Sequence, residues 1–108
     1  MKRPIAYSNV ACEAAQLLGA GVRLARQERR WTVQELADRV GVTHTTIRKV
    51  ERGDPTVALG TAFEAAAVVG VPLFHEDAAR RAVEAGRLAD RLAVLPRTVR
   101  APAVDDDF

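Results

Sequence analysis

At 108 residues the chain has room for one domain and a short appendage, but not for two independent hydrophobic cores. Hydrophobic residues make up 48% of it and aromatic residues only 5%, so its apolar content is mainly Ala, Val and Leu, which favours helices over sheet. Cys12 is the only cysteine, which excludes an internal disulfide and a thiolate metal cluster. The longest apolar stretch, residues 57–74, is too interrupted to span a membrane. We therefore expect a soluble, cytoplasmic, all-α protein.

Turn and capping residues divide the chain into five expected helices. Thr32 precedes the second helix and Glu35 follows three residues later, which is the spacing of a capping box. Gly41 ends that helix, because glycine adopts the left-handed C-cap conformation without penalty, and Thr43 is the N-cap candidate of the third helix. The expected helices are residues 9–30, 33–40, 44–52, 56 or 57 to 69, and 76–95, of which the fourth is nearly apolar all round and is expected to be largely buried.

The segment from Val33 to Arg52 has the pattern of two helices that cross through a short turn. Ala37 has to be small because the partner helix crosses close above it. Gly41 has to be glycine because the chain bends where a Cβ atom would clash. The residues expected to build this helix-turn-helix are Leu36, Ala37, Gly41, Ile47 and Val50, with Val40 and Val42 beside them.

If Ile47 and Val50 point inward, the opposite face of the third helix points outward and fits the major groove of DNA, which is about 12 Å wide. Lys49 suits guanine O6 and N7, while His44 and Thr45 lie near the helix N-terminus, where base edges are usually contacted. Hydroxyl groups at helix starts and basic side chains suit phosphate oxygens. The expected phosphate contacts are Thr32, Thr43, Thr46 and Arg52.

The charge distribution agrees with this interpretation. Residues 21–52 contain eight basic and four acidic residues, a net charge of +4, whereas the whole chain has +2. A localised basic patch is the usual electrostatic footprint of phosphate binding, although a solvated helix face gives the same pattern. The alternative for the motif is a plain helical hairpin with no DNA role, but such a hairpin would not need outward Lys and Arg beside short hydroxyl side chains.

Residues 18–74 resemble the Xre (lambda-repressor-like, Cro/C1-type) DNA-binding domain, and Glu51-Arg52-Gly53 is similar to that family's usual end of the recognition helix. The resemblance implies a five-helix fold, base contacts from His44, Thr45 and Lys49 with Arg48 as a further candidate, and a structural ion pair between Arg26 and Glu51. Members often have a glutamine that touches the DNA backbone where this chain has Val33. That contact is therefore in doubt, and the adjacent Gln34 joins the expected phosphate contacts.

A narrower similarity concerns residues 51–61 and the tail, residues 95–100 and 105–108, which resemble the HipB-like branch of the family. Proteins of that branch are antitoxins that bind a HipA-type Ser/Thr kinase toxin and repress their shared operon as dimers. The resemblance therefore implies a palindromic DNA operator, a second copy of the chain and a HipA-like kinase toxin as partners. The alternatives are a stand-alone Xre-family or phage-type regulator without a toxin, and a protein-interaction module whose helix-turn-helix has lost its DNA affinity.

Beyond the expected DNA-binding domain, residues 9–74, we expect a C-terminal helix in residues 75–95 and a flexible acidic tail, residues 96–108. An apolar stripe on that helix exceeds what a small core needs, which favours pairing in a homodimer over folding back on its own domain. The stripe consists of Ala78, Ala82, Ala85, Leu88, Leu92 and Leu95. Phe108 is a candidate anchor in a partner's pocket, although a disordered solubilising tail is the simpler interpretation. The sequence lacks a nucleophile–base pair and metal-spaced ligands, so we expect no enzymatic activity, cofactor or metal.

Overall fold

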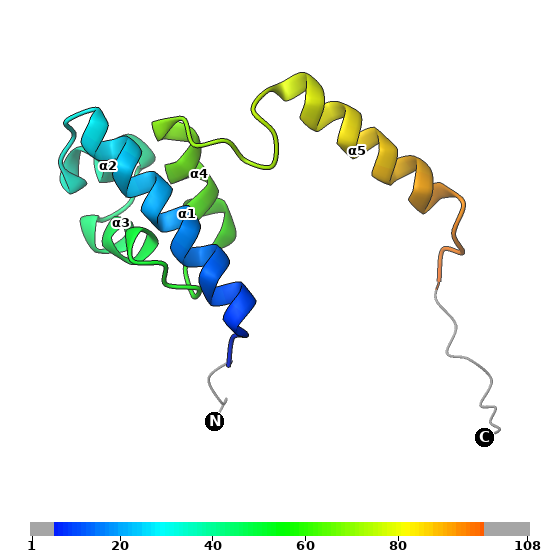
Figure 1. Cartoon of the computed structure of the whole chain (residues 1–108), viewed down its shortest axis with the longest axis horizontal. Coiled ribbons are helices and arrows are strands. Elements are labelled where there is room, and N and C mark those ends of the chain that lie inside the picture. Colours follow the sequence, from blue (N-terminus) through cyan, green and yellow to red (C-terminus); the bar gives the residue numbers. More distant parts are fainter. Residues whose placement is uncertain (1–5, 99–108) are drawn as a thin grey trace. The chain divides into compact units, whose positions relative to one another are not determined.

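The computed structural model describes residues 6–98, and within this range the chain forms five α-helices and no β-strand (Figure 1). The expectation of an all-α, five-helix fold is confirmed. The chain divides after Leu73 into two compact units, of which the first contains four helices and the second contains one. The helices are α1 (Asn9–Glu28), α2 (Val33–Val40), α3 (His44–Glu51), α4 (Leu59–Val69) and α5 (Ala78–Ala93).

Capping side chains fix the ends of α2 and α3. Thr32 Oγ1 accepts a hydrogen bond from the backbone N–H of Glu35 (3.0 Å), and the Glu35 carboxylate accepts one from the N–H of Thr32 (2.7 Å), so the capping box is formed. Gly41 ends α2 with a φ of 87°, a conformation that residues with side chains rarely adopt. The expected clash with a neighbour is wrong, because an added Cβ atom would have nothing within 4 Å, so the positive φ alone explains the glycine. The hydroxyl oxygen of Thr43 accepts a hydrogen bond from the N–H of Thr46 (3.3 Å) and caps α3. The turn between the two helices is thereby fixed at both ends.

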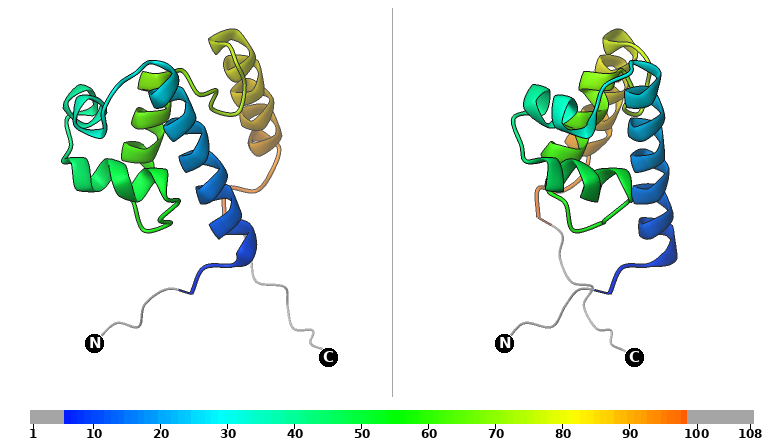
Figure 2. Two further views of the ribbon diagram at one scale, coloured as in Figure 1. Left: turned by 60° about the vertical axis from the view of Figure 1, so that its left-hand side comes forward. Right: turned by 90° about the vertical axis from the view of Figure 1, so that its left-hand side faces the viewer.

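Small and branched aliphatic side chains from all four helices form the core of the first unit. Val22 of α1, Leu36 of α2 and Ile47 of α3 are fully buried. The other buried hydrophobic residues are Ala37, Val50, Ala65, Ala66 and Val69. In both views of Figure 2, α2, α3 and α4 lie on the same side of α1, and all three contact it or one another. The inner side of the helix-turn-helix is thus part of the main core.

The end of α3 approaches α1 closely at Gly19. A Cβ atom at this position would clash with the carbonyl oxygen of Val50 and would lie 2.8 Å from that of Glu51. Gly53 makes a similar approach from the other chain segment, because its φ is 78° and a Cβ atom there would lie 2.6 Å from Gln16 Cα. Two glycines therefore allow the end of α3 to rest directly on the backbone of α1.

α4 differs from the expectation in its start and in its burial. It begins at Leu59 because Asp54 holds the preceding residues in a turn, with its Oδ1 atom accepting from both the N–H (2.8 Å) and the hydroxyl (2.6 Å) of Thr56. Three residues of α4 are buried and Leu59 is 69% exposed, so the expectation of a largely buried helix was wrong. A small domain lacks enough polar surface to cover every apolar side chain. The other helices end within two residues of the expected bounds.

α5 is the helical part of the second unit. Asp77 caps its start, because the Asp77 carboxylate accepts a hydrogen bond from the N–H of Arg80 (2.7 Å). None of its residues is buried, and Leu88 and Leu92 are 51% and 67% exposed. Among the described residues, no helix combines the length and the apolar character that a membrane crossing requires.

Candidate nucleic-acid interface

α3 has one buried side and one exposed side. Ile47 is fully buried and Val50 is 4% exposed, so the helical period turns the remaining positions toward solvent. His44, Thr45, Arg48 and, directly after the helix, Arg52 are exposed, whereas Lys49 is half-buried. The structure thus gathers the base-contact candidates on one helix, with Lys49 less accessible than a fully outward position would make it.

Two of the three threonine candidates for phosphate contact, Thr32 and Thr43, also serve as helix caps. Thr43 Oγ1 and Thr46 Oγ1 lie 3.1 Å apart and share a hydrogen bond, so only one of these hydroxyl groups has its proton available for another acceptor. The Thr32 hydroxyl accepts the capping bond from Glu35 and keeps its own proton. Two of the three hydroxyl protons, that of Thr32 and one of the Thr43–Thr46 pair, therefore remain available for a phosphate oxygen.

Gln34 has a partner that sequence reasoning missed. Its Nε2 atom donates to Asp38 Oδ1 at 2.8 Å, one turn further along α2. The i,i+4 spacing of these two residues was the available signal. A carboxylate beside the amide makes this place less favourable for a phosphate than the sequence suggested. Val33, at the departure from the family pattern, is half-buried at the start of α2.

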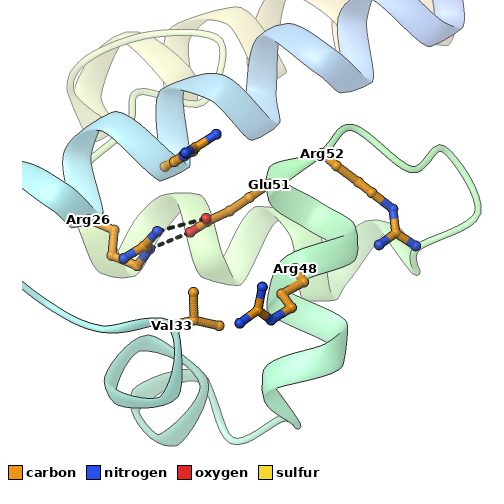
Figure 3. A pocket seen from close by; sticks show the side chains of 6 residues that line it. Arg26, Val33, Arg48, Glu51 and Arg52 are labelled. Carbon is orange, nitrogen blue, oxygen red and sulfur yellow. Dashed lines mark hydrogen bonds and ion pairs between the residues drawn. The ribbon is translucent and has the colours of Figure 1, made fainter.

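The ion pair that the resemblance implies joins α1 to the end of α3 (Figure 3). Arg26 Nε and Nη2 donate to the two carboxylate oxygens of Glu51 at 2.6 Å and 3.0 Å. Arg26 Nη1 donates to the carbonyl oxygen of Trp31 at 2.7 Å. The two charged side chains are only 10% and 8% exposed. A pair this well satisfied positions α3 on the domain, while desolvation offsets much of its contribution to stability.

Two basic residues of the segment 21–52, Arg29 and Arg39, lie against the ring of Trp31. The guanidinium of Arg39 lies 4.0 Å from the centre of the indole ring and that of Arg29 lies 5.8 Å from it, both within the range of cation–π attraction. Trp31 also packs against the core. No periodicity connects Arg39 with Trp31 in the sequence, so only the fold brings them together.

Asp54 adds a negative charge at the end of α3. Its Oδ2 atom lies 3.9 Å from Arg52 Nη2. The two hydrogen bonds from Thr56, assisted by the positive charges of Arg52 and Lys49, hold the pKa of Asp54 below its ordinary value. No hydrogen bond between Asp54 and Thr56 was predicted, although Asp followed two residues later by Thr is a usual turn signal. The remaining candidate, Phe108, lies outside the described residues together with Asp105–Asp107.

Comparison with known proteins yields one match. A family model described as helix-turn-helix matches residues 22–75, which is half of the chain. The matched range contains α2, α3 and α4, and with them the exposed face of α3 and both partners of the buried ion pair. No curated protein and no solved structure matches the chain significantly.

Proposed function

We propose that this chain, which belongs to the Cro/C1-type (Xre-like) helix-turn-helix family and is a DNA-binding transcription regulator, acts as a dimeric repressor on a two-fold symmetric operator. The observation that carries the proposal is the outer side of α3. Exposed polar residues stand there on a helix whose opposite side is anchored by the buried residues Ile47 and Val50. Such a helix fits the major groove, where base pairs present distinct hydrogen-bonding patterns.

The proposed contacts divide into base reading and phosphate binding. His44 and Thr45 stand at the N-terminal end of α3, where a recognition helix meets base edges, and Lys49 one turn later suits guanine. Arg48 was expected to join these base contacts. The hydroxyl groups and the positive charge suited to phosphate oxygens belong to Thr32, Thr43, Thr46 and Arg52, with Gln34 beside them in spite of its bond to Asp38.

The narrower role that we propose is that of an antitoxin. Its support is the similarity of residues 51–61 and of the tail to the HipB-like branch, which would give the chain a HipA-like kinase toxin as a second partner. Co-expression with the proteins encoded beside its gene, followed by affinity purification, tests this role. A stable complex with a kinase is the expected result. Recovery of the chain without a kinase would favour a stand-alone regulator.

DNA reading is tested by selecting duplexes from a random pool with the full-length protein and measuring their affinity by fluorescence anisotropy. We expect selected sites with two-fold symmetry and half-sites about 34–36 Å apart. Lys49→Ala should weaken binding by about 1–3 kcal/mol and relax selection at one base position in each half-site. Arg30→Ala is the control, because it also removes one positive charge from the first unit but lies outside α3.

Two outcomes would contradict these assignments. Unchanged base selection by Lys49→Ala would remove Lys49 from the reading surface. Failure of the unmodified protein to select any sequence would favour a protein-interaction module with an inactive helix-turn-helix.

A further inference from the structure

The first unit contains a pocket of about 310 Å³ in which α1 and α3 come together beside the start of α2. Its lining consists of Arg23, Arg26, Val33, Arg48, Glu51 and Arg52. The lining thus contains four arginines and one carboxylate. Figure 3 shows Arg48 extending from α3 toward Val33, on the same side as the pair of Arg26 with Glu51. The volume holds several water molecules at about 30 Å³ each, which is room for a small anion.

The positive charge of this pocket is not balanced by the protein. Glu51 has both carboxylate oxygens engaged by Arg26, so this pair is neutral as a unit. Among residues 6–98, Arg23 and Arg48 have no carboxylate partner within ion-pair distance, although both side chains border the same space. Arg52 is 64% exposed and has Asp54 at 3.9 Å. Like charges repel, and two unpaired guanidinium groups in one pocket therefore favour a bound anion.

We propose that Arg23 and Arg48 together hold one phosphate group in this pocket. Guanidinium groups present a planar fork of N–H donors that matches phosphate oxygens. The Arg26–Glu51 pair forms the back of the site and Val33 an apolar wall. The phosphate comes either from the DNA backbone or from a free phosphate ligand, and the first source rests on the proposed function. The site adds α1 to the DNA-binding surface and gives Arg48 a role that does not depend on base sequence.

The test compares Arg23→Gln, Arg48→Gln and the double variant by measuring the salt dependence of DNA binding. Each phosphate that a protein neutralises contributes about 0.9 to the slope of log K against log salt concentration. If both arginines hold the same phosphate, the magnitude of this slope should fall by about 0.9 in each single variant and by the same amount in the double variant. The ratio of affinities for selected and unrelated duplexes should stay unchanged, because phosphate contacts carry no direct sequence information.

A second measurement separates the two sources. Isothermal titration of the DNA-free protein with inorganic phosphate should show binding that the double variant abolishes if the ligand is a free phosphate, and DNA binding would then be unaffected by the variants. Arg30→Gln, which removes a charge outside the pocket, should change neither measurement. Circular dichroism verifies that each variant is folded.

Three results would overturn the proposal. The first is unchanged DNA binding together with phosphate binding that is absent or that the double variant retains. The second is a slope that falls by about 1.8 in the double variant but about 0.9 in each single one, since the arginines would then bind separate phosphates. The third is altered base selection by Arg48→Gln, which would make Arg48 a base-reading residue. If the unmodified protein selects no DNA sequence, the proposed function fails. Titration with inorganic phosphate still tests whether the pocket binds a phosphate group.

Discussion

At the scale of single residues, the buried pair of Arg26 with Glu51 allows a direct prediction. Arg26→Met leaves the Glu51 carboxylate buried without its partner and the carbonyl oxygen of Trp31 without its donor. Removing one member of a buried pair costs about 3–5 kcal/mol, a large part of the total of about 5–15 kcal/mol for a small domain. We expect urea denaturation to show a loss of that size.

The double variant Arg26→Met, Glu51→Met is the control for the charge. Replacing both members by apolar side chains removes the uncompensated carboxylate, so most of the lost stability should return. A double variant as unstable as Arg26→Met would show that packing, and not the unpaired charge, causes the loss.

The sequence pattern predicted contacts between residues close together in the chain, but not contacts that depend on how two elements pack. The bonds between Thr32 and Glu35 span three positions and follow from helix geometry alone, so they were predicted with their partners. The stacking of Arg39 on Trp31 depends on how two elements meet, and no sequence pattern encodes it. The half-buried state of Lys49 was missed because the helical period predicts the direction of a side chain but not how far neighbouring elements cover it.

At the scale of elements, the contact between α1 and α3 depends on Gly19. Gly19→Ala places a methyl group against the carbonyl oxygens of Val50 and Glu51, which cannot yield without moving α3. Overpacking of this kind typically costs about 1–3 kcal/mol. We expect a lower midpoint of urea denaturation and weaker DNA binding, because the displaced helix carries the proposed reading surface.

Gly60→Ala is the matched comparison. Gly60 lies in the first turn of α4 with no atom within 4 Å of an added Cβ, so alanine there should not lower the stability of the protein. Equal effects of the two substitutions would rule out a close approach at Gly19. In the sequence alone Gly19 is only a residue of low helix propensity. Its role emerges once α3 lies against it, just as the late start of α4 emerges from the turn at Asp54.

At the scale of the whole molecule, the sequence predicted the number of helices and their order, because capping residues and glycines mark most of the helix boundaries. The function of α5 was harder to infer. Its apolar stripe is visible in the sequence, but a stripe does not state whether it meets its own domain, a second copy or another protein. The exposure of Leu88 and Leu92 makes them the residues with which to test the homodimer.

Leu88→Glu combined with Leu92→Glu should convert the proposed dimer into a monomer, because two charges would have to be buried in the interface. Val83→Glu is the control on the same helix. Val83 is 69% exposed and lies about 140° around the helix from Leu88 and on the opposite side from Leu92. Sedimentation velocity at micromolar concentration should show a monomer for the double variant and a dimer for Val83→Glu.

The monomer should also lose the preference for two half-sites at a fixed spacing, since only a two-fold pair of recognition helices can measure it. A monomeric unmodified protein, or a double variant that remains dimeric, would exclude α5 as the dimer interface.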